Sequence, residues 1–258
     1  MPIDYEHLMS LRTRGERLTY ANRDTLLYAL GVGLGRDPDD RHEYPYVADP
    51  AVLKTLPSFA SVLTADNLLD DCGWDAARVV LRDELVTLDR PIDDSGSLLV
   101  DSDVAAVFDK GAEGGALIAV ESRARRERDG EPVFTVRRSW LAPGDGGFGG
   151  PKGASVARHP VPNRRPDMTH HCLTRPDQAL LFQLSTQAKS GQAAGQTTAK
   201  ALHPLCLQGI ACLAILREIC EYDHTLIRSL AFTQAGPAYA GETLVAELWQ
   251  DANVVSCR

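Results

Sequence analysis

The side chains able to act as nucleophiles gather in the C-terminal half of the chain. His203 precedes Cys206 by three residues, and a thiolate activated by a histidine attacks thioesters readily. Cys212 falls inside the apolar run 205–216, so we expect it to be a core residue. A loop histidine and a helix cysteine at this spacing are also ordinary structural residues. The pattern therefore favours structural roles over a catalytic Cys–His pair.

A run of possible metal ligands, His170, His171 and Cys172, lies further upstream. Adjacent residues in an extended segment point to opposite sides, and the sequence offers no obvious fourth ligand. The six cysteines of the chain include no CxxC pair. We therefore predict reduced cytoplasmic thiols, no metal and no cofactor.

The bulk composition excludes several classes of partner. The chain has 258 residues, of which 44% are hydrophobic and 24% charged, and its formal net charge is −8. An acidic chain lacks the basic footprint that nucleic acids and anionic membranes require, so we expect neither as a partner. The most apolar window, 205–216, is too short to cross a bilayer, and the N-terminus MPIDYEHLMS does not resemble a signal peptide.

In the first half, a helix is expected before a series of strands. Leucines at helical spacing follow Thr19, and the glycines of GVGLG, 31–35, are expected to end that helix. A nucleotide-binding glycine loop would need a strand before it and a helix after it, which is the reverse of this order. From about residue 81, apolar and polar residues alternate and predict strands, with a hairpin turn at Asp129–Gly130.

The second half repeats this pattern in a shorter form. A Gly/Pro-rich connector near 150–170 separates the halves, and helices are expected at 174–185 and 209–222. Strand-like runs follow at 242–250 and 253–258, where the first half has three at 97–107, 116–125 and 131–141. We therefore expect the C-terminal sheet to be one strand shorter, with its open edge capped by a loop or by another subunit. A strand within 223–233 is the alternative.

Taken in order, these segments resemble the double-hotdog, MaoC-like hydratases, that is, the type-two (R)-specific enoyl-CoA hydratases. The resemblance implies an α+β double hotdog with an N-terminal unit at 1–150 and a C-terminal unit at 151–258, the latter holding the active site. It also implies an acyl-CoA or acyl-carrier thioester as ligand and assembly as a homodimer or hetero-oligomer. The matching segments are LLYALGVGLGRDP (26–38), VLKTLPSFASVL (52–63), LDRPI (88–92), VFDKGAEGGALI (107–118), GGFGG (146–150), PNRRPD (162–167), DQALLFQLS (177–185) and YAGETLVAELW (239–249).

The catalytic motif departs from the resemblance. The position of the family's catalytic Asp holds Gln187, and that of its catalytic His, five residues later, holds Gln192. Lys189 and Ser190 replace the intervening Asn-Pro, and the family's His-Gly pair reads Gln208–Gly209. A glutamine amide can orient a water or bind a carbonyl, but it cannot exchange protons near neutral pH. Because general acid–base groups contribute about 10²–10⁴-fold each, ordinary hydratase activity should be largely lost.

Residues that would bind a thioester remain. The Gly209 N–H could act as an oxyanion donor, or the glycine could simply permit close packing. By resemblance, Lys110 and Gly111 approach the CoA phosphates, although a hairpin lysine is the plain alternative. We also expect His203, Gln208 and Lys189 to contact substrate. Two functions follow: altered lyase, isomerase or cyclase chemistry on an enoyl or hydroxyacyl thioester, or a catalytically inactive acyl-thioester-binding protein or partner subunit of an active homologue.

Overall fold

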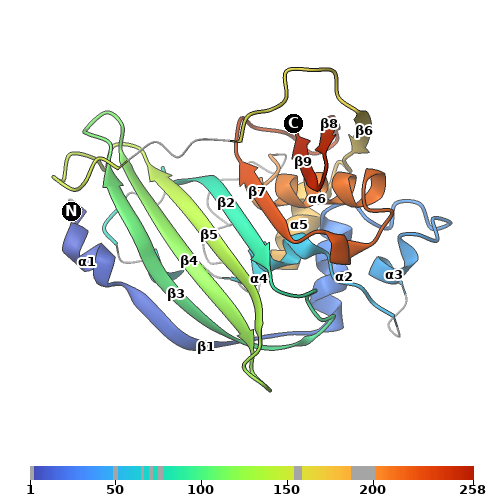
Figure 1. The fold of residues 1–258 in the computed structure, drawn as a ribbon, viewed down its shortest axis with the longest axis horizontal. Helices are drawn as coiled ribbons and strands as arrows, with labels where there is room; N and C mark the ends of the chain where they lie inside the picture. Colours follow the sequence, from blue (N-terminus) through green and yellow to red (C-terminus); the bar gives the residue numbers. More distant parts are fainter. Residues whose placement is uncertain are drawn as a thin grey trace.

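A six-stranded antiparallel sheet forms the larger part of the fold (Figure 1). The computed structural model describes residues 3–48, 52–64, 67–69, 72–74, 78–153, 159–186 and 201–258. The strand order in the sheet is β1-β3-β4-β5-β2-β7. Its strands are β1 (Arg12–Tyr20), β2 (Val80–Leu88), β3 (Gly96–Asp109), β4 (Ala116–Arg126), β5 (Pro132–Ala142) and β7 (Ser229–Thr233).

A three-stranded antiparallel sheet, in the order β6-β8-β9, is built from the C-terminal half. Its strands are β6 (Met168–Leu173), β8 (Thr243–Asp251) and β9 (Val254–Cys257). The strand within 223–233, β7, pairs with β2 and so extends the larger sheet rather than this one. Within the described residues, β9 pairs only with β8. A cap on the open edge of β9 stays a prediction, as does the division of the chain near residue 150.

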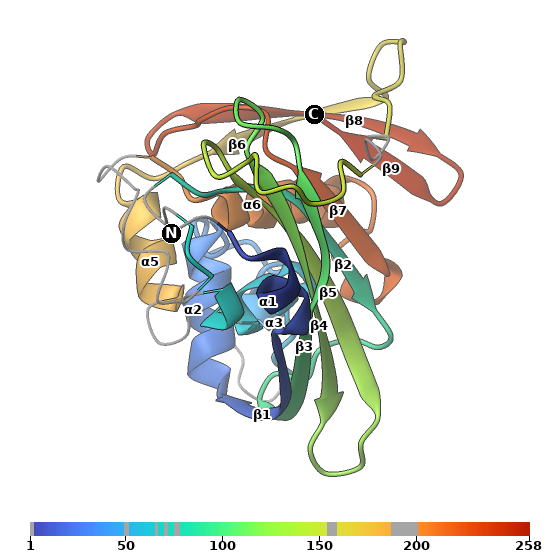
Figure 2. The same cartoon turned by 90° about the vertical axis from the view of Figure 1, so that its left-hand side faces the viewer.

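The helices lie on one face of the six-stranded sheet, and the smaller sheet lies beyond α6 (Figure 2). Within the described residues, no helix combines the length and apolar character that a membrane crossing demands. The helices and 3-10 turns are α1 (Tyr5–Ser10), α2 (Asn22–Gly31), α3 (Tyr44–Val47), η1 (Pro57–Phe59), α4 (Ala60–Leu63), η2 (Asn67–Leu69), α5 (Gln178–Thr186), α6 (Pro204–Glu218) and η3 (His224–Leu226).

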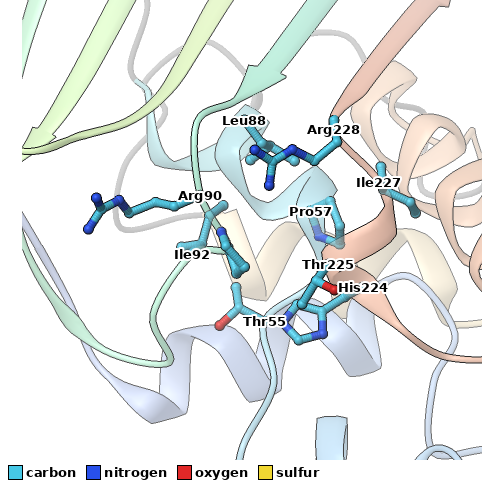
Figure 3. Close-up of a pocket in the computed structure, with 10 residues that line it drawn as sticks. Thr55, Pro57, Leu88, Arg90, Ile92, His224, Thr225, Ile227 and Arg228 are labelled. Atoms are coloured by element: carbon cyan, nitrogen blue, oxygen red, sulfur yellow. The ribbon is translucent and has the colours of Figure 1, made fainter.

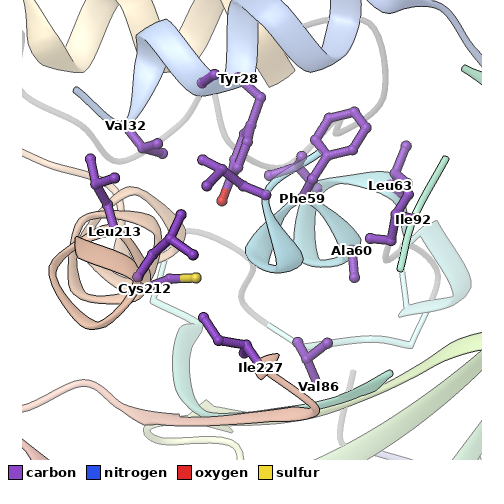
Figure 4. Close-up of a cluster of buried hydrophobic side chains, with 14 of the residues drawn as sticks. Tyr28, Val32, Phe59, Ala60, Leu63, Val86, Ile92, Cys212, Leu213 and Ile227 are labelled. Carbon is purple, nitrogen blue, oxygen red and sulfur yellow. The ribbon is translucent and has the colours of Figure 1, made fainter. Parts of the chain in front are cut away.

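The main core joins both halves of the chain. In Figure 4, apolar side chains from α2, α4, α6 and the sheet converge on one centre. Tyr28 of α2 and Phe59 of η1 pack with ring centroids 5.2 Å apart. Val86 of β2 and Leu213 of α6 belong to the same buried cluster. Because α6 is buried in this cluster, its position depends on the larger sheet as well as on its own half.

Helix α6 begins earlier than the sequence pattern predicted. The expected range was 209–222, and the observed helix is Pro204–Glu218. Proline at the first helical position and a capping His203 start it, because proline loses no hydrogen bond there. Glu221 and Tyr222 both have positive φ, 48° and 60°, which ends the helical path. Gln208 and Gly209 therefore lie in the second turn and do not open the helix.

Candidate functional site

The N-terminus of α6 is fixed by His203. Its Nδ1 accepts the backbone N–H of Leu205 at 3.2 Å, which satisfies a donor that a helix start leaves unpaired. The ring stacks on Phe182 of α5, with centroids 5.8 Å apart and planes inclined by 19°. An accepting Nδ1 places the remaining proton on Nε2. His203 thus presents an N–H donor at the start of α6.

His203 is neutral over the physiological range. Burial, followed by the positive charge of Arg138, lowers the pKa of His203 to about 4, and the charge of Glu84 opposes this in part. A neutral imidazole can donate a hydrogen bond to a carbonyl, but at neutral pH it has no extra proton to deliver. The geometry therefore suits a polarising contact better than general acid catalysis.

A buried polar cluster connects the larger sheet to α6. Glu84 on β2 and Arg138 on β5 are register partners, and Glu84 Oε2 lies 2.5 Å from Arg138 Nε. Ser61 of α4 lies 2.5 Å from Glu84 Oε1, and its Oγ is 3.4 Å from the Gln208 side chain. Arg138 also donates to the backbone carbonyls of Ser61 and Thr64. We call Ser61, Glu84, Arg138 and Gln208 the polar cluster.

The polar cluster holds one atom without a partner. The Gln208 side chain is 3% exposed, and its amide nitrogen Nε2 is buried with no hydrogen-bond partner in the part of the chain that the structure describes. Sequence reasoning missed the rest of the cluster. The available signal was that Glu84 and Arg138 occupy inward-facing positions in strands whose buried and exposed residues alternate. An unpaired charge at such a position would be costly.

Gly209 is explained by close packing. A Cβ at this position would lie 2.4 Å from Val32 Cγ1 and 3.0 Å from the Tyr28 hydroxyl, so only glycine allows α2 and α6 to approach this closely. Figure 4 shows Tyr28 pointing from α2 toward the space between α4 and α6. An N–H in the second turn of a helix ordinarily bonds to the carbonyl four residues earlier. An oxyanion role for Gly209 stays a prediction.

The cysteines near α6 are not activated. The Cys206 side chain is 0% exposed, and burial raises its pKa well above the usual range. Burial likewise raises the pKa of Cys212 to about 11. A thiolate is therefore inaccessible at both positions near neutral pH, which argues against a Cys–His nucleophile.

The His170–Cys172 run does not form a metal site in the described structure. His170 lies 2.7 Å from Glu218 through Nδ1, and Cys172 is buried on strand β6. His171, between them in the sequence, is exposed. Among the described residues, no group of three or more His, Cys, Asp or Glu side chains is placed to hold a metal ion.

Lys110 and Gly111 lie in the turn between β3 and β4 of the larger sheet (Figure 1). Lys110 Nζ donates to the carbonyl of Lys152 at 2.7 Å and lies 5.3 Å from the centre of the Phe108 ring. The Asp109 carboxylate accepts the Gly111 N–H at 2.8 Å, and hydrogen bonds from the backbone lower the pKa of Asp109. The structure does not bring Lys110 to His203 or Gln208.

Three of the predicted site residues, Gln187, Lys189 and Gln192, lie outside the described residues. The described chain stops at Thr186, the last residue of α5, and resumes two residues before His203. The roles of Gln187, Lys189 and Gln192 stay predictions from the sequence.

Two cavities differ in size and setting. The one in Figure 3, between the end of β2 and η3, measures about 10 Å³ and has room for about one water molecule. The other measures about 240 Å³ and lies between β1, β3 and the end of α4, where Leu63 and Thr64 line it. Its lining is mixed, with apolar side chains from Leu18, Leu63 and Val100 and polar ones from Glu16, Arg17, Thr19, Thr64 and Ser102. Only the second is large enough for part of a ligand.

Comparison with known proteins places this geometry in a fold class. A solved protein from Mycobacterium tuberculosis described as having a double hotdog fold aligns with a TM-score of 0.55 at 13% identity, over 98% of this chain and 89% of that one. A MaoC-like dehydratase from Phytophthora capsici aligns with a TM-score of 0.77 at 21% identity, over 97% and 89%. The expected α+β double hotdog is confirmed.

The sequence comparisons identify the family. Residues 18–144 match the MFE-2 hydratase 2 N-terminal domain. The enoyl-CoA hydratase ChsH3 of Mycobacterium tuberculosis is 33% identical over 97% of this chain and 91% of its own length. The chain belongs to the MaoC-like enoyl-CoA hydratase 2 family, and it is hydratase/dehydratase-like.

Proposed function

We propose that this chain binds acyl thioesters, carried by CoA or by an acyl carrier protein, and does not hydrate enoyl thioesters by an Asp/His mechanism. The observation that carries the proposal is the pair Gln187 and Gln192, at the two positions where the family motif has its base and acid. Neither amide can take up or release a proton near neutral pH. The loss concerns proton transfer and leaves binding groups in place.

The 240 Å³ cavity supports acyl binding. Leu63 and Thr64 line it, and Ser61, three residues before Thr64, contacts Gln208. Arg138 donates to the carbonyls of Ser61 and Thr64, so one buried cation fixes both the cavity wall and the polar cluster. An acyl chain in this cavity would have its polar end near α6. Within its mixed lining, Leu18, Leu63 and Val100 can contact a short hydrocarbon segment.

His203 supports residual chemistry at a bound thioester. The Nε2–H of the neutral imidazole has no partner among the described residues, and it can polarise a carbonyl without delivering a proton. The presence of Gln187 and Gln192 removes proton transfer but leaves this polarisation possible. On this basis we propose lyase, isomerase or cyclase chemistry that relies on positioning. Such a reaction would need a substrate that supplies its own acid or base.

A second candidate function is a non-catalytic partner subunit of an active homologue. Leu180 and Leu184 of α5 are separated by one helical turn and are 52% and 59% exposed. Two exposed apolar side chains one turn apart lie on the same helix face, where they would contribute to a contact with another subunit. Such a subunit would occur as a homodimer or hetero-oligomer.

Turnover and binding separate these functions. The purified protein would be incubated with a panel of enoyl-CoA and hydroxyacyl-CoA thioesters, with product masses followed over time and affinity measured by calorimetry. New product masses support altered catalysis. Saturable binding without any product supports the non-catalytic binder. Failure of every thioester to bind would contradict the proposal itself.

A further inference from the structure

The hydrogen bonds of the polar cluster determine which atom of Gln208 is free. Glu84 is a carboxylate paired with Arg138, so both of its oxygens can only accept hydrogen bonds. Ser61 has one hydroxyl proton, and the 2.5 Å contact with Glu84 Oε1 uses it. The Ser61 oxygen then has only lone pairs left to offer to other neighbours.

Gln208 must therefore turn its amide nitrogen toward Ser61. The atom 3.4 Å from Ser61 Oγ is assigned as Gln208 Oε1, which would place two acceptors face to face. The oxygen and nitrogen of a glutamine amide are distinguished only by their hydrogen bonds. Rotating the amide by about 180° lets Nε2 donate to Ser61 Oγ and removes the buried nitrogen that has no partner.

The rotated amide leaves a carbonyl oxygen in the unpaired position. A buried acceptor without a partner is a place for a ligand or water that donates a hydrogen bond. The carbonyl oxygen of a thioester cannot donate, and neither can the carbon–carbon double bond of an enoyl group. A hydroxyl group on the acyl chain can.

We propose that Gln208 accepts a hydrogen bond from the hydroxyl group of a bound 3-hydroxyacyl thioester, and that Ser61, held by Glu84 and Arg138, fixes the amide in this orientation. This inference rests on the proposed function, acyl-thioester binding. It assigns Gln208 to selectivity between hydroxylated and non-hydroxylated acyl chains. Ser61 is a positioning residue, because it acts through Gln208.

The ratio of two affinities tests the assignment. Calorimetry would compare (R)-3-hydroxybutyryl-CoA with butyryl-CoA, which differ only by the hydroxyl group. We expect the wild-type protein to prefer the hydroxylated ligand by about threefold to tenfold, the range of a single neutral hydrogen bond. Gln208→Leu should bring the ratio close to one. Ser61→Ala should lower it, because the amide is then free to rotate.

Ser58→Ala is the matched control. Ser58 is a buried serine on the neighbouring turn η1, and within the described residues no hydrogen bond joins it to the polar cluster, so this variant should keep the wild-type ratio. Thermal unfolding would check that each variant folds. If Gln208→Leu does not fold, the affinity ratio of the wild-type protein still tests the hydroxyl contact. Equal binding of both ligands by wild type would overturn the hydroxyl contact while leaving acyl-thioester binding intact. Absence of binding by either ligand would overturn both.

Discussion

Arg138 Nε lies 2.5 Å from Glu84 Oε2, and the two side chains are 3% and 0% exposed. They form a charged cross-strand pair on the inner face of the sheet. The neighbouring cross-strand pair on this face, Val86 and Val136, is apolar. Removing two charges from water is costly, and each charge offsets that cost only while the other is present. The pair therefore fixes β2, β5 and α4 relative to one another, with Gln208 attached through Ser61.

Breaking this pair should be strongly destabilising. We expect Arg138→Met to lower the free energy of unfolding by about 3–5 kcal/mol, because it leaves the Glu84 carboxylate buried and unpaired. Urea denaturation would measure the loss. The double variant Arg138→Met with Glu84→Leu should be closer to wild type than the single one. A double variant no more stable than Arg138→Met would contradict the argument.

An exposed ion pair supplies the comparison. Arg14 lies 2.5 Å from Asp103, and the two side chains are 51% and 29% exposed. Solvent screens such a pair, so Arg14→Met should lower stability far less than Arg138→Met does. A loss of stability as large as that of Arg138→Met would mean that burial does not explain the difference between the two ion pairs.

Gly209→Ala should destabilise the fold although alanine is the better helix former. The new Cβ would lie 2.4 Å from Val32 Cγ1, and overpacking of this kind costs about 1–3 kcal/mol. Thermal unfolding would measure it. Val32→Ala added to Gly209→Ala should recover part of the loss, because it removes the clashing methyl group. Unchanged stability in Gly209→Ala would mean that α2 and α6 do not approach this closely.

His203 should make the folded state sensitive to mild acid. Its pKa is lowered from 6.5 to about 4, so between these pH values the unfolded chain binds a proton at His203 that the folded chain does not. Stability from this residue is therefore complete above about pH 6.5 and falls as pH falls toward 4, by at most about 1.4 kcal/mol per pH unit.

Asparagine at position 203 isolates this effect. Asn is a good helix cap and does not titrate in this range, so His203→Asn should keep α6 and flatten the pH dependence. Urea midpoints at pH 7, 6 and 5 would be compared between the two proteins. His224, whose pKa burial also lowers, contributes equally to both and cancels in the difference. Parallel curves for the two proteins would contradict the lowered pKa of His203.

Restoring the family dyad should restore some hydration. We expect Gln187→Asp with Gln192→His to raise hydration of crotonyl-CoA above the wild-type background, and Lys189→Asn to increase it further. Only partial rescue is expected, since neighbouring groups also orient a catalytic pair. The control is Gln187→Asn with Gln192→Asn, which cannot exchange protons. Equal rates for the two double variants would mean that these positions do not carry the chemistry.

The long alternating strands were predictable because each buries one face. The expected runs 97–107, 116–125 and 131–141 became β3, β4 and β5, within one or two residues at most ends. Strand β1 was missed, since it is an edge strand whose residues are mostly exposed and show no alternation. Helix α6 begins five residues before the predicted start, because Pro204 opens the helix ahead of most of the apolar run.

The candidate site was predictable only in part. Gln208 was found through the family motif and His203 through its spacing from Cys206, and the structure places them on α6 and at its cap. The other members of the polar cluster lie about 70 to 147 residues before Gln208 in the chain, so only the folded sheet brings them together. Lys110 was assigned by resemblance alone, and no local signal gives its distance from α6.

Hydration of crotonyl-CoA by the wild-type protein tests the central claim most directly. The change in absorbance of the enoyl thioester would be followed at saturating substrate, with thioester binding verified by calorimetry on the same sample. Because neither Gln187 nor Gln192 can transfer protons, we predict binding with a kcat at least a hundredfold below the typical enzyme value of roughly 10 s⁻¹. A kcat near roughly 10 s⁻¹ would contradict the account and would mean that another acid and base act in this site.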